Sequence, residues 1–166
     1  MNPPILSRTL DTPIGQFTLA ATDAGIHAIA FPRNTHPLPR RDEWQPGTHR
    51  WLEAAARQLD EYFAGKRRVF ELPLVAHGTS FQQRVWAALR SIPFGNTWSY
   101  AELAHAIGQP SAMRAVGAAN GRNPIPIVVP CHRVIGRDGS LTGFAGGLET
   151  KTALLRLEGA LPEPLV

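Results

Sequence analysis

Three prolines in one short segment constrain the fold of this chain more than any other feature. They stand at positions 124, 126 and 130 of the stretch Asn123–Val134, which reads NPIPIVVPCHRV. Each proline fixes φ, lacks an amide donor and biases the preceding residue toward extended geometry, so no helix can form there. The sequence therefore predicts a rigid, extended segment that packs its apolar side chains into the core and ends at Cys131. Those side chains belong to Ile127, Val128 and Val129.

Cys131 is the only cysteine of the chain. A lone cysteine is more often a small buried hydrophobic residue than a nucleophile. Here His132 and Arg133 follow at once, and positively charged neighbours favour a thiolate over a thiol. The stiff proline segment further favours a presented, reactive side chain. From these residues alone, both interpretations stay open.

The overall composition narrows the classes of protein to consider. With 166 residues, 43% hydrophobic and 18% charged, the chain suits one large globular domain or two small ones. Its apolar runs are too short for a bilayer and its N-terminus lacks a signal layout, so we expect no membrane contact. One cysteine cannot form an internal disulfide, which favours a reducing, cytoplasmic location. We expect no metal and no cofactor, because no cysteine-rich or closely paired histidine motif is present.

Positive charge is concentrated in one part of the chain. Between Arg84 and Asp138 the sequence has six arginines and only two acidic residues, Glu102 and Asp138 itself. Such a cluster is consistent with a polyanionic partner, and equally with a solvated surface. The charge by itself does not separate these two interpretations.

Residues 1–78 are predicted to form a small α/β domain, a β-meander followed by a helix. Alternating apolar residues between turn signals indicate strands at 5–10, 16–22 and 26–31. Residues 32–47 are interpreted as a surface loop. Thr48 is expected to cap a helix that ends near Phe63, and one more strand is expected at 69–74. This domain carries no recognisable chemistry and is interpreted as a scaffold.

Residues 79–166 are predicted to form a mostly helical domain. Ser80 with Gln83, and Ser99 with Glu102, have the spacing of capping boxes that open helices ending near residues 91 and 107. A third helix is expected over 111–120. Two short helices around a glycine-bearing turn indicate a helix-turn-helix, although many such pairs are only structural corners.

The third helix has an unusual composition for a DNA reader. It begins Ser111-Ala112-Met113-Arg114-Ala115 and offers one long cationic side chain among small residues. Readers of base sequence present several Arg, Gln or Asn side chains, so this helix suits close, sequence-independent approach to DNA. Alternatively, its alanines pack against other helices.

The end of the chain contains a glycine-rich loop and a last helix. The loop at 142–147 lacks the motifs of nucleotide-binding loops and is interpreted as passing close to a ligand. The helix is expected over 149–158 with Gly159 as its C-terminal cap. Its expected packing residues are Leu148, Thr152, Leu155 and Leu157.

Five motifs of the C-terminal half together resemble the O6-alkylguanine-DNA alkyltransferase family. They occur in order and are specific as a set, and the strong resemblance covers about residues 79–160. The motifs are SYAELA at 99–104, RAVG at 114–117, NPIPI at 123–127, PCHRV at 130–134 and GGL at 146–148. The N-terminal layout also resembles the α/β domain of that family.

The resemblance implies direct DNA repair by a single-turnover methyltransferase. Cys131 would irreversibly accept the alkyl group of O6-alkylguanine, and of O4-alkylthymine, from a nucleotide flipped out of double-stranded DNA. His132 would activate Cys131 through a water, Glu158 would orient His132, and Tyr100 would donate a proton to the departing base. The protein would act as a monomer.

The resemblance also implies a set of contact residues. Arg114 would replace the flipped nucleotide in the base stack and Asn123 would act as a hinge. DNA contacts would come from Arg114, Ala115, Ser111, Ala112, Asn123 and Arg122, and the substrate pocket from Val134, Phe144, Ala145 and Gly146.

Two alternatives belong to other functional classes. A helix-turn-helix regulator would use the helix pair alone and would not need Cys131 behind a proline segment. A non-catalytic binder of alkylated DNA would lack the acceptor thiol, which this chain has. Transfer of a methyl group to the protein separates repair from both alternatives.

Overall fold

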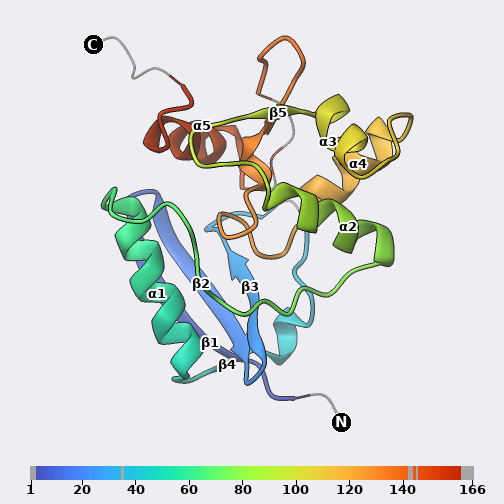
Figure 1. Cartoon of the computed structure of the whole chain (residues 1–166). Helices are drawn as coiled ribbons and strands as arrows, with labels where there is room; N and C mark the ends of the chain where they lie inside the picture. The colour runs from blue at the N-terminus through green and yellow to red at the C-terminus, as the bar shows by residue number, and fades with distance from the viewer. Residues whose placement is uncertain (1–2, 35, 142–143, 145, 162–166) are drawn as a thin grey trace.

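The N-terminal part of the protein is a four-stranded sheet with one helix on it. The structure is a computed structural model and describes residues 3–34, 36–141, 144 and 146–161. The strands β1 (Leu6–Thr12), β2 (Gly15–Thr22), β3 (Gly25–Ala30) and β4 (Gln45–Pro46) lie in the order β3-β2-β1-β4. The first three form an antiparallel meander, as predicted, and β4 runs parallel to β1. Figure 1 shows this sheet and α1 (Arg50–Phe63) in the lower half of the molecule.

Alternation along the strands gives the sheet two covered faces. Phe17 and Leu19 of β2 pack with the apolar side of α1, where Leu52 and Leu59 are fully buried. On the other face, Ala20 belongs to a small cluster that Trp44 covers. Successive side chains of β2 point to opposite faces and both faces are covered, so the second half of the strand is continuously buried, while α1 buries one side with the 3.6-residue period that the sequence predicted.

Three local predictions for this part are wrong. The segment 32–47 is not only a loop, because it contains a 3-10 turn at Arg41–Glu43 and the edge strand β4. The cap of α1 is His49, whose Nδ1 accepts from the Trp51 amide at 3.1 Å, and not Thr48. Residues 69–74 form no strand beyond a single bridge from Leu74 to Ile26. Pro73 interrupts the amide donors that a longer strand would need.

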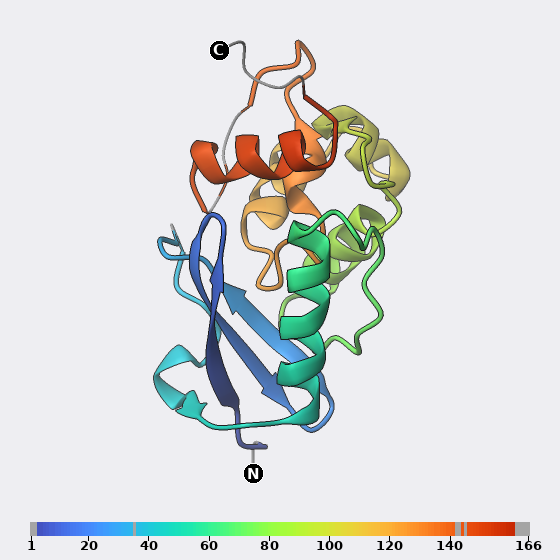
Figure 2. The ribbon, with the colours of Figure 1, turned by 90° about the vertical axis from the view of Figure 1, so that its left-hand side faces the viewer.

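The C-terminal part consists of short helices around the proline segment. It contains α2 (Ser80–Leu89), β5 (Trp98–Ser99), α3 (Tyr100–Ala106), α4 (Met113–Gly121), a 3-10 turn (Cys131–Arg133), β6 (Val134–Ile135) and α5 (Leu148–Leu157). Helices α2, α3 and α4 pack against one another, and this arrangement contains the predicted helix pair. In Figure 2, α5 lies above the sheet, close to the upper end of α1. No helix in the described part of the chain is long and apolar enough to cross a membrane.

The capping boxes show how closely sequence spacing specifies helix starts. Ser99 with Glu102 forms the predicted box. The box of α2 is formed one residue earlier than predicted, by Thr79 and Gln82, while Gln83 donates to the Ala76 carbonyl at 2.6 Å. Thr79 with Gln82 and Ser80 with Gln83 both have the spacing of a capping box, so the spacing alone does not predict which of the two pairs forms it.

The proline segment is not an extended strut. It is buried and folds back on itself, with a bridge between Pro126 and Val129 and a hydrogen bond from the Val129 amide to the Ile125 carbonyl at 2.9 Å. Asn123 holds this turn, since its side chain accepts from Ile125 N at 3.0 Å and donates to Val129 O at 2.7 Å. Ile127 has φ +74°, a strained conformation for a β-branched residue, at a site where its side chain is fully buried.

The two parts of the molecule share one apolar core. A single cluster of buried residues runs from the sheet and α1 through α2 to the proline segment. The amide of Ile29 in β3 also donates to the carbonyl of Pro124 at 2.9 Å. The segment before Cys131 is thus fixed against the edge of the N-terminal sheet.

Candidate active site

Cys131 begins the 3-10 turn that follows the proline segment. It is 5% exposed, and β6 follows the turn directly. β6 pairs in parallel with β5, with Trp98 opposite Val134. This short pairing brings the start of α3 next to the cysteine turn.

The thiol of Cys131 is stable as a neutral group in the resting protein. Burial raises its pKa to about 11, while the Asn123 side chain, Lys151 and the nearby backbone amides act in the opposite direction. Activation of the thiol therefore requires a base that removes its proton. The expectation that Arg133 directly favours the thiolate is not supported, because its guanidinium is engaged with Glu158.

Lys151 is a fully buried cation beside this thiol, and it is not among the site residues predicted from the sequence. Its Nζ donates to the Val134 carbonyl at 2.6 Å. Burial lowers its pKa to about 8, and interaction with Cys131 opposes that shift. The available signal was helical spacing, because Lys151 lies three and four residues before the buried Leu154 and Leu155. The predicted packing residues Leu148 and Leu157 are instead exposed, at 50% and 36%.

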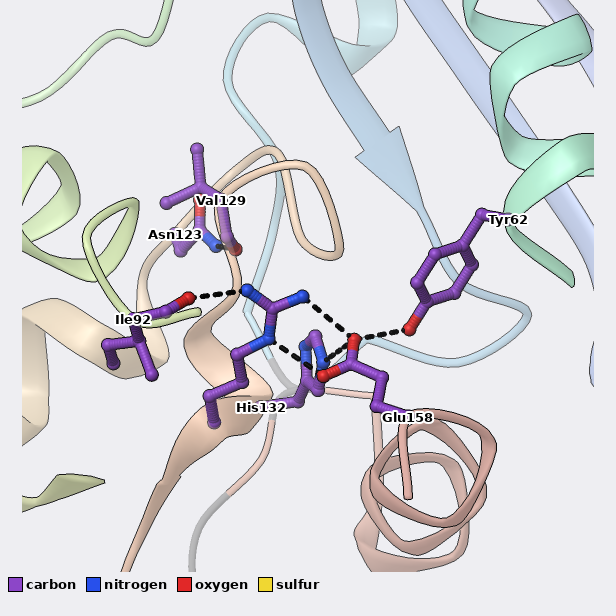
Figure 3. A network of polar contacts seen from close by, with 7 residues as sticks. Tyr62, Ile92, Asn123, Val129, His132 and Glu158 are labelled. Atoms are coloured by element: carbon purple, nitrogen blue, oxygen red, sulfur yellow. Dashed lines mark hydrogen bonds and ion pairs between the residues drawn. The ribbon is translucent and has the colours of Figure 1, made fainter. Parts of the chain in front are cut away.

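The carboxylate of Glu158 is the centre of a buried polar network (Figure 3). Its Oε2 accepts from His132 Nε2 at 2.8 Å, and Arg133 binds both oxygens, from Nε at 2.7 Å and Nη2 at 3.0 Å. The remaining Arg133 Nη1 donates to the Ile92 carbonyl at 2.6 Å. Burial alone would raise the pKa of Glu158, but His132 and Arg133 bring it down to about 2.

His132 is arranged as a neutral base. It is fully buried, and burial lowers its pKa although the hydrogen bond to Glu158 acts to raise it. Because Glu158 is ionised, His132 Nε2 carries the proton and Nδ1 keeps its lone pair. Among the residues that the structure describes, Nδ1 has no hydrogen-bond partner. It is therefore available to accept a proton.

A fourth donor to this network comes from the N-terminal part. Tyr62 of α1 is fully buried, and its hydroxyl donates to Glu158 Oε2 at 2.6 Å. From the sequence alone, this part carries no recognisable chemistry. No sequence motif could have paired two residues 96 positions apart.

Cys131 also lines a cavity of about 170 Å³ between the two parts of the molecule. Phe31 and Pro39 contribute from the N-terminal part, and Asn120, Asn123 and Phe144 from the C-terminal part. Asn120 is 2% exposed, and its Oδ1 lacks a partner within the described part of the chain. The cavity thus combines aromatic walls, a thiol and an unpaired acceptor.

The predicted pocket residues have different positions relative to this cavity. Phe144 lines it, whereas Val134 is fully buried and is not among the described lining residues. Gly146 packs so closely on Phe31 that a Cβ there would lie 2.5 Å from the ring. Ala145 lies outside the described residues.

The predicted DNA-contact residues lie at both ends of α4. Arg114, Ala115 and Ser111 are exposed, and Ala112 is half-buried. Arg122 is exposed at the other end of α4 and lines the cavity, whereas Asn123 is buried. The half-buried Tyr100 faces α4, because a Cβ at Gly117 would be 3.6 Å from its ring.

Comparison with known proteins covers both parts of the chain. Residues 5–76 match the family model described as 6-O-methylguanine DNA methyltransferase, ribonuclease-like domain, and residues 80–160 match the DNA binding domain. The methylated-DNA–protein-cysteine methyltransferase of Mycobacterium bovis is 50% identical over 151 residues, covering 91% of this chain and 90% of the relative. The chain belongs to the O6-alkylguanine-DNA alkyltransferase family.

Other members of the family support the same assignment. The methylated-DNA–protein-cysteine methyltransferase of Methanosarcina acetivorans is 47% identical over 150 residues, covering 90% of this chain and 96% of the relative. The crystal structure of Mycobacterium tuberculosis OGT in complex with DNA superimposes with a TM-score of 0.86 at 48% identity, covering 93% of both chains. The family resemblance and the fold class predicted from the sequence are confirmed.

Proposed function

We propose that this protein repairs double-stranded DNA by transferring the alkyl group of O6-alkylguanine, and of O4-alkylthymine, irreversibly to Cys131. The observation that carries the proposal is a single thiol that lines a cavity next to a buried base and carboxylate. Residues 79–166 would bind DNA and hold the acceptor, and residues 1–78 would form the supporting domain. The protein would act in the cytoplasm as a monomer.

The transfer is a displacement at the alkyl carbon. The Cys131 sulfur forms the new S–C bond while the C–O6 bond of the lesion breaks, and the electron pair of that bond stays on the base. The thiol proton passes through a water to His132 Nδ1, and the imidazolium is stabilised by Glu158. Tyr100 donates a proton to the departing guanine, which leaves unmodified guanine in the DNA. Lys151 stabilises the thiolate while it exists.

The product explains why each molecule acts once. A thioether has no leaving group under these conditions, and the chain has no second cysteine to resolve it. Lesion removal with excess substrate is therefore expected to plateau at one lesion per protein molecule. Quantifying O6-methylguanine in an oligonucleotide after long incubation measures this ratio. Continued turnover, or no loss of lesion at all, would contradict the proposal; the second outcome would favour a binding protein or a regulator.

Access to the lesion requires nucleotide flipping. A base inside a duplex cannot reach a buried thiol, and unstacking costs a few kcal/mol, less for a lesion that pairs poorly. Small residues on α4 would allow close backbone approach, and the exposed Arg114 would fill the vacated stack. Ser111, Ala112, Ala115 and Arg122 would contact the DNA around it.

Arg114→Ala is expected to slow repair of duplex DNA much more than repair of the free modified base. A residue that replaces the flipped nucleotide matters only where a stack exists, whereas a phosphate contact would affect binding to all DNA equally. The measurement is the ratio of single-turnover rates on duplex DNA and on free O6-alkylguanine, compared with wild type. Arg137→Ala, which removes another exposed cation, serves as the charge control. Equal loss on both substrates would exclude Arg114 from the flipping role.

A further inference from the structure

The hydrogen bond from Tyr62 to Glu158 joins two parts of the chain in the proposed proton relay. Tyr62 lies near the C-terminal end of α1, and Glu158 directly follows α5. Figure 3 shows the Tyr62 ring pointing from α1 toward the Glu158 carboxylate. Both side chains are buried, and the distance from Oη to Oε2 is 2.6 Å. Such a short hydrogen bond to a charged acceptor is a strong one.

The donors are unequally shared between the two oxygens of Glu158. Oε2 accepts from Tyr62 Oη, His132 Nε2 and Arg133 Nη2, whereas Oε1 accepts only from Arg133 Nε among the described residues. Tyr62 and His132 therefore interact with the same oxygen. Any charge that the hydroxyl neutralises on Oε2 reduces the attraction between Glu158 and a protonated His132.

Packing alone would not require the hydroxyl group. The Tyr62 ring contacts three aromatic rings, with centroid distances of 5.2 Å to Phe63, 5.6 Å to Phe70 and 6.2 Å to Phe94. Phenylalanine would make the same ring contacts. A buried hydroxyl costs free energy unless it is bonded, and here its partner is the carboxylate that also binds His132. The hydroxyl is thus the part of Tyr62 that bears on the chemistry.

We propose that Tyr62 is a positioning residue for alkyl transfer, whose hydroxyl fixes Glu158 Oε2 and sets how strongly Glu158 holds a proton on His132. The inference rests on the proposed function and deepens it, because it gives the N-terminal part a role in the chemistry. The other charged groups that act on His132 come from elements already described: Arg133 in the 3-10 turn and Lys151 in α5, both lowering its pKa. Tyr62 is the residue through which α1 acts on His132, by way of Glu158.

The direction of the effect of Tyr62→Phe follows from the competition for Oε2. Without the hydroxyl, the carboxylate interacts more strongly with the imidazolium, so the pKa of His132 rises. Repair requires neutral His132, so the acid limb of the rate profile should move to higher pH, by roughly half a unit or more. The plateau rate should fall as well, because the carboxylate loses one of the donors that orient it.

The test is the single-turnover repair rate of the full chain on O6-methylguanine duplex DNA, measured across the acid limb. Gln58→Met is the matched control, since Gln58 lies one turn earlier in α1, is 4% exposed and bonds only the Glu71 backbone among the described residues. It should lower the melting temperature and leave the acid limb in place. A shift in Tyr62→Phe without a shift in Gln58→Met supports the inference.

A second variant makes the test independent of folding defects. Site-specific replacement of Tyr62 by 3-fluorotyrosine keeps the ring and strengthens the hydroxyl as a donor, so the acid limb should move to lower pH. If the acid limb lies at the same pH in wild type, in Tyr62→Phe and in the fluorinated protein, the inference is overturned, even where the plateau rates differ. If the wild type itself transfers no methyl group, the proposed function fails; if it does and the profiles overlap, only the role of Tyr62 fails.

Discussion

Cys131→Ala is expected to abolish removal of O6-methylguanine while leaving binding to alkylated duplex DNA nearly unchanged. The sulfur is the only atom of the chain proposed to accept the alkyl group, and the exposed residues of α4 are unaffected by its removal. The substitution removes one buried atom, so its effect on stability should be limited to about 1 kcal/mol.

The measurements for this variant are lesion content by nucleoside analysis and affinity by fluorescence anisotropy. A thermal melt confirms that the variant is folded. Residual repair well above the background of the oligonucleotide alone would mean that another residue accepts the alkyl group. If the variant loses both DNA binding and repair, Cys131 has a structural role instead.

Glu158→Gln is expected to have the second largest effect, on both stability and rate. The amide leaves Arg133 buried without its counter-charge, and breaking a buried ion pair in this way costs about 3–5 kcal/mol. It also removes the charge that stabilises a protonated His132, so the transfer rate should fall by about 10²-fold at neutral pH. Glu149→Gln is the matched control, because Glu149 is an exposed acid in the first turn of α5.

The same pair of variants reports on acid stability. The folded pKa of Glu158, about 2, lies below its ordinary value of 4.5, so its contribution is present above pH 4.5 and is lost as pH falls toward 2. Because the pKa of Glu158 differs between the unfolded and folded states, this contribution to the free energy of unfolding is about 3 kcal/mol. Denaturant unfolding across that range should show a loss of stability that is smaller in Glu158→Gln than in wild type and Glu149→Gln, because only the contribution of Glu158 is missing from it. Parallel curves for all three proteins would mean that Glu158 is not held ionised by the network.

Local signals in the sequence were sufficient for most of the secondary structure. The meander follows from alternation and turn residues, and the box of Ser99 with Glu102 has its predicted geometry. The predictions that are wrong concern segments whose conformation is determined by tertiary contacts. Prolines exclude a helix over 124–130, but only the side chain of Asn123 and the edge of β3 explain why the segment folds back.

In the site, too, local sequence predicts some residues and tertiary packing brings in the others. Cys131, His132 and Arg133 are adjacent in the chain, so a motif predicts their proximity. Tyr62 and Lys151 reach the site through packing, and neither carries a local signature beyond its position on the buried side of a helix. Burial also shifts pKa values in ways that composition cannot predict, since it raises the pKa of the Cys131 thiol and lowers that of His132.

The central claim is that Cys131 accepts the alkyl group, and the mass of the intact protein tests it most directly. After incubation with O6-methylguanine duplex DNA, wild type should gain the mass of one methyl group, and fragmentation should place it on Cys131. Incubation with the same duplex containing unmodified guanine should add nothing. A protein that removes the lesion without gaining mass, or that carries the methyl group on another residue, would contradict the account.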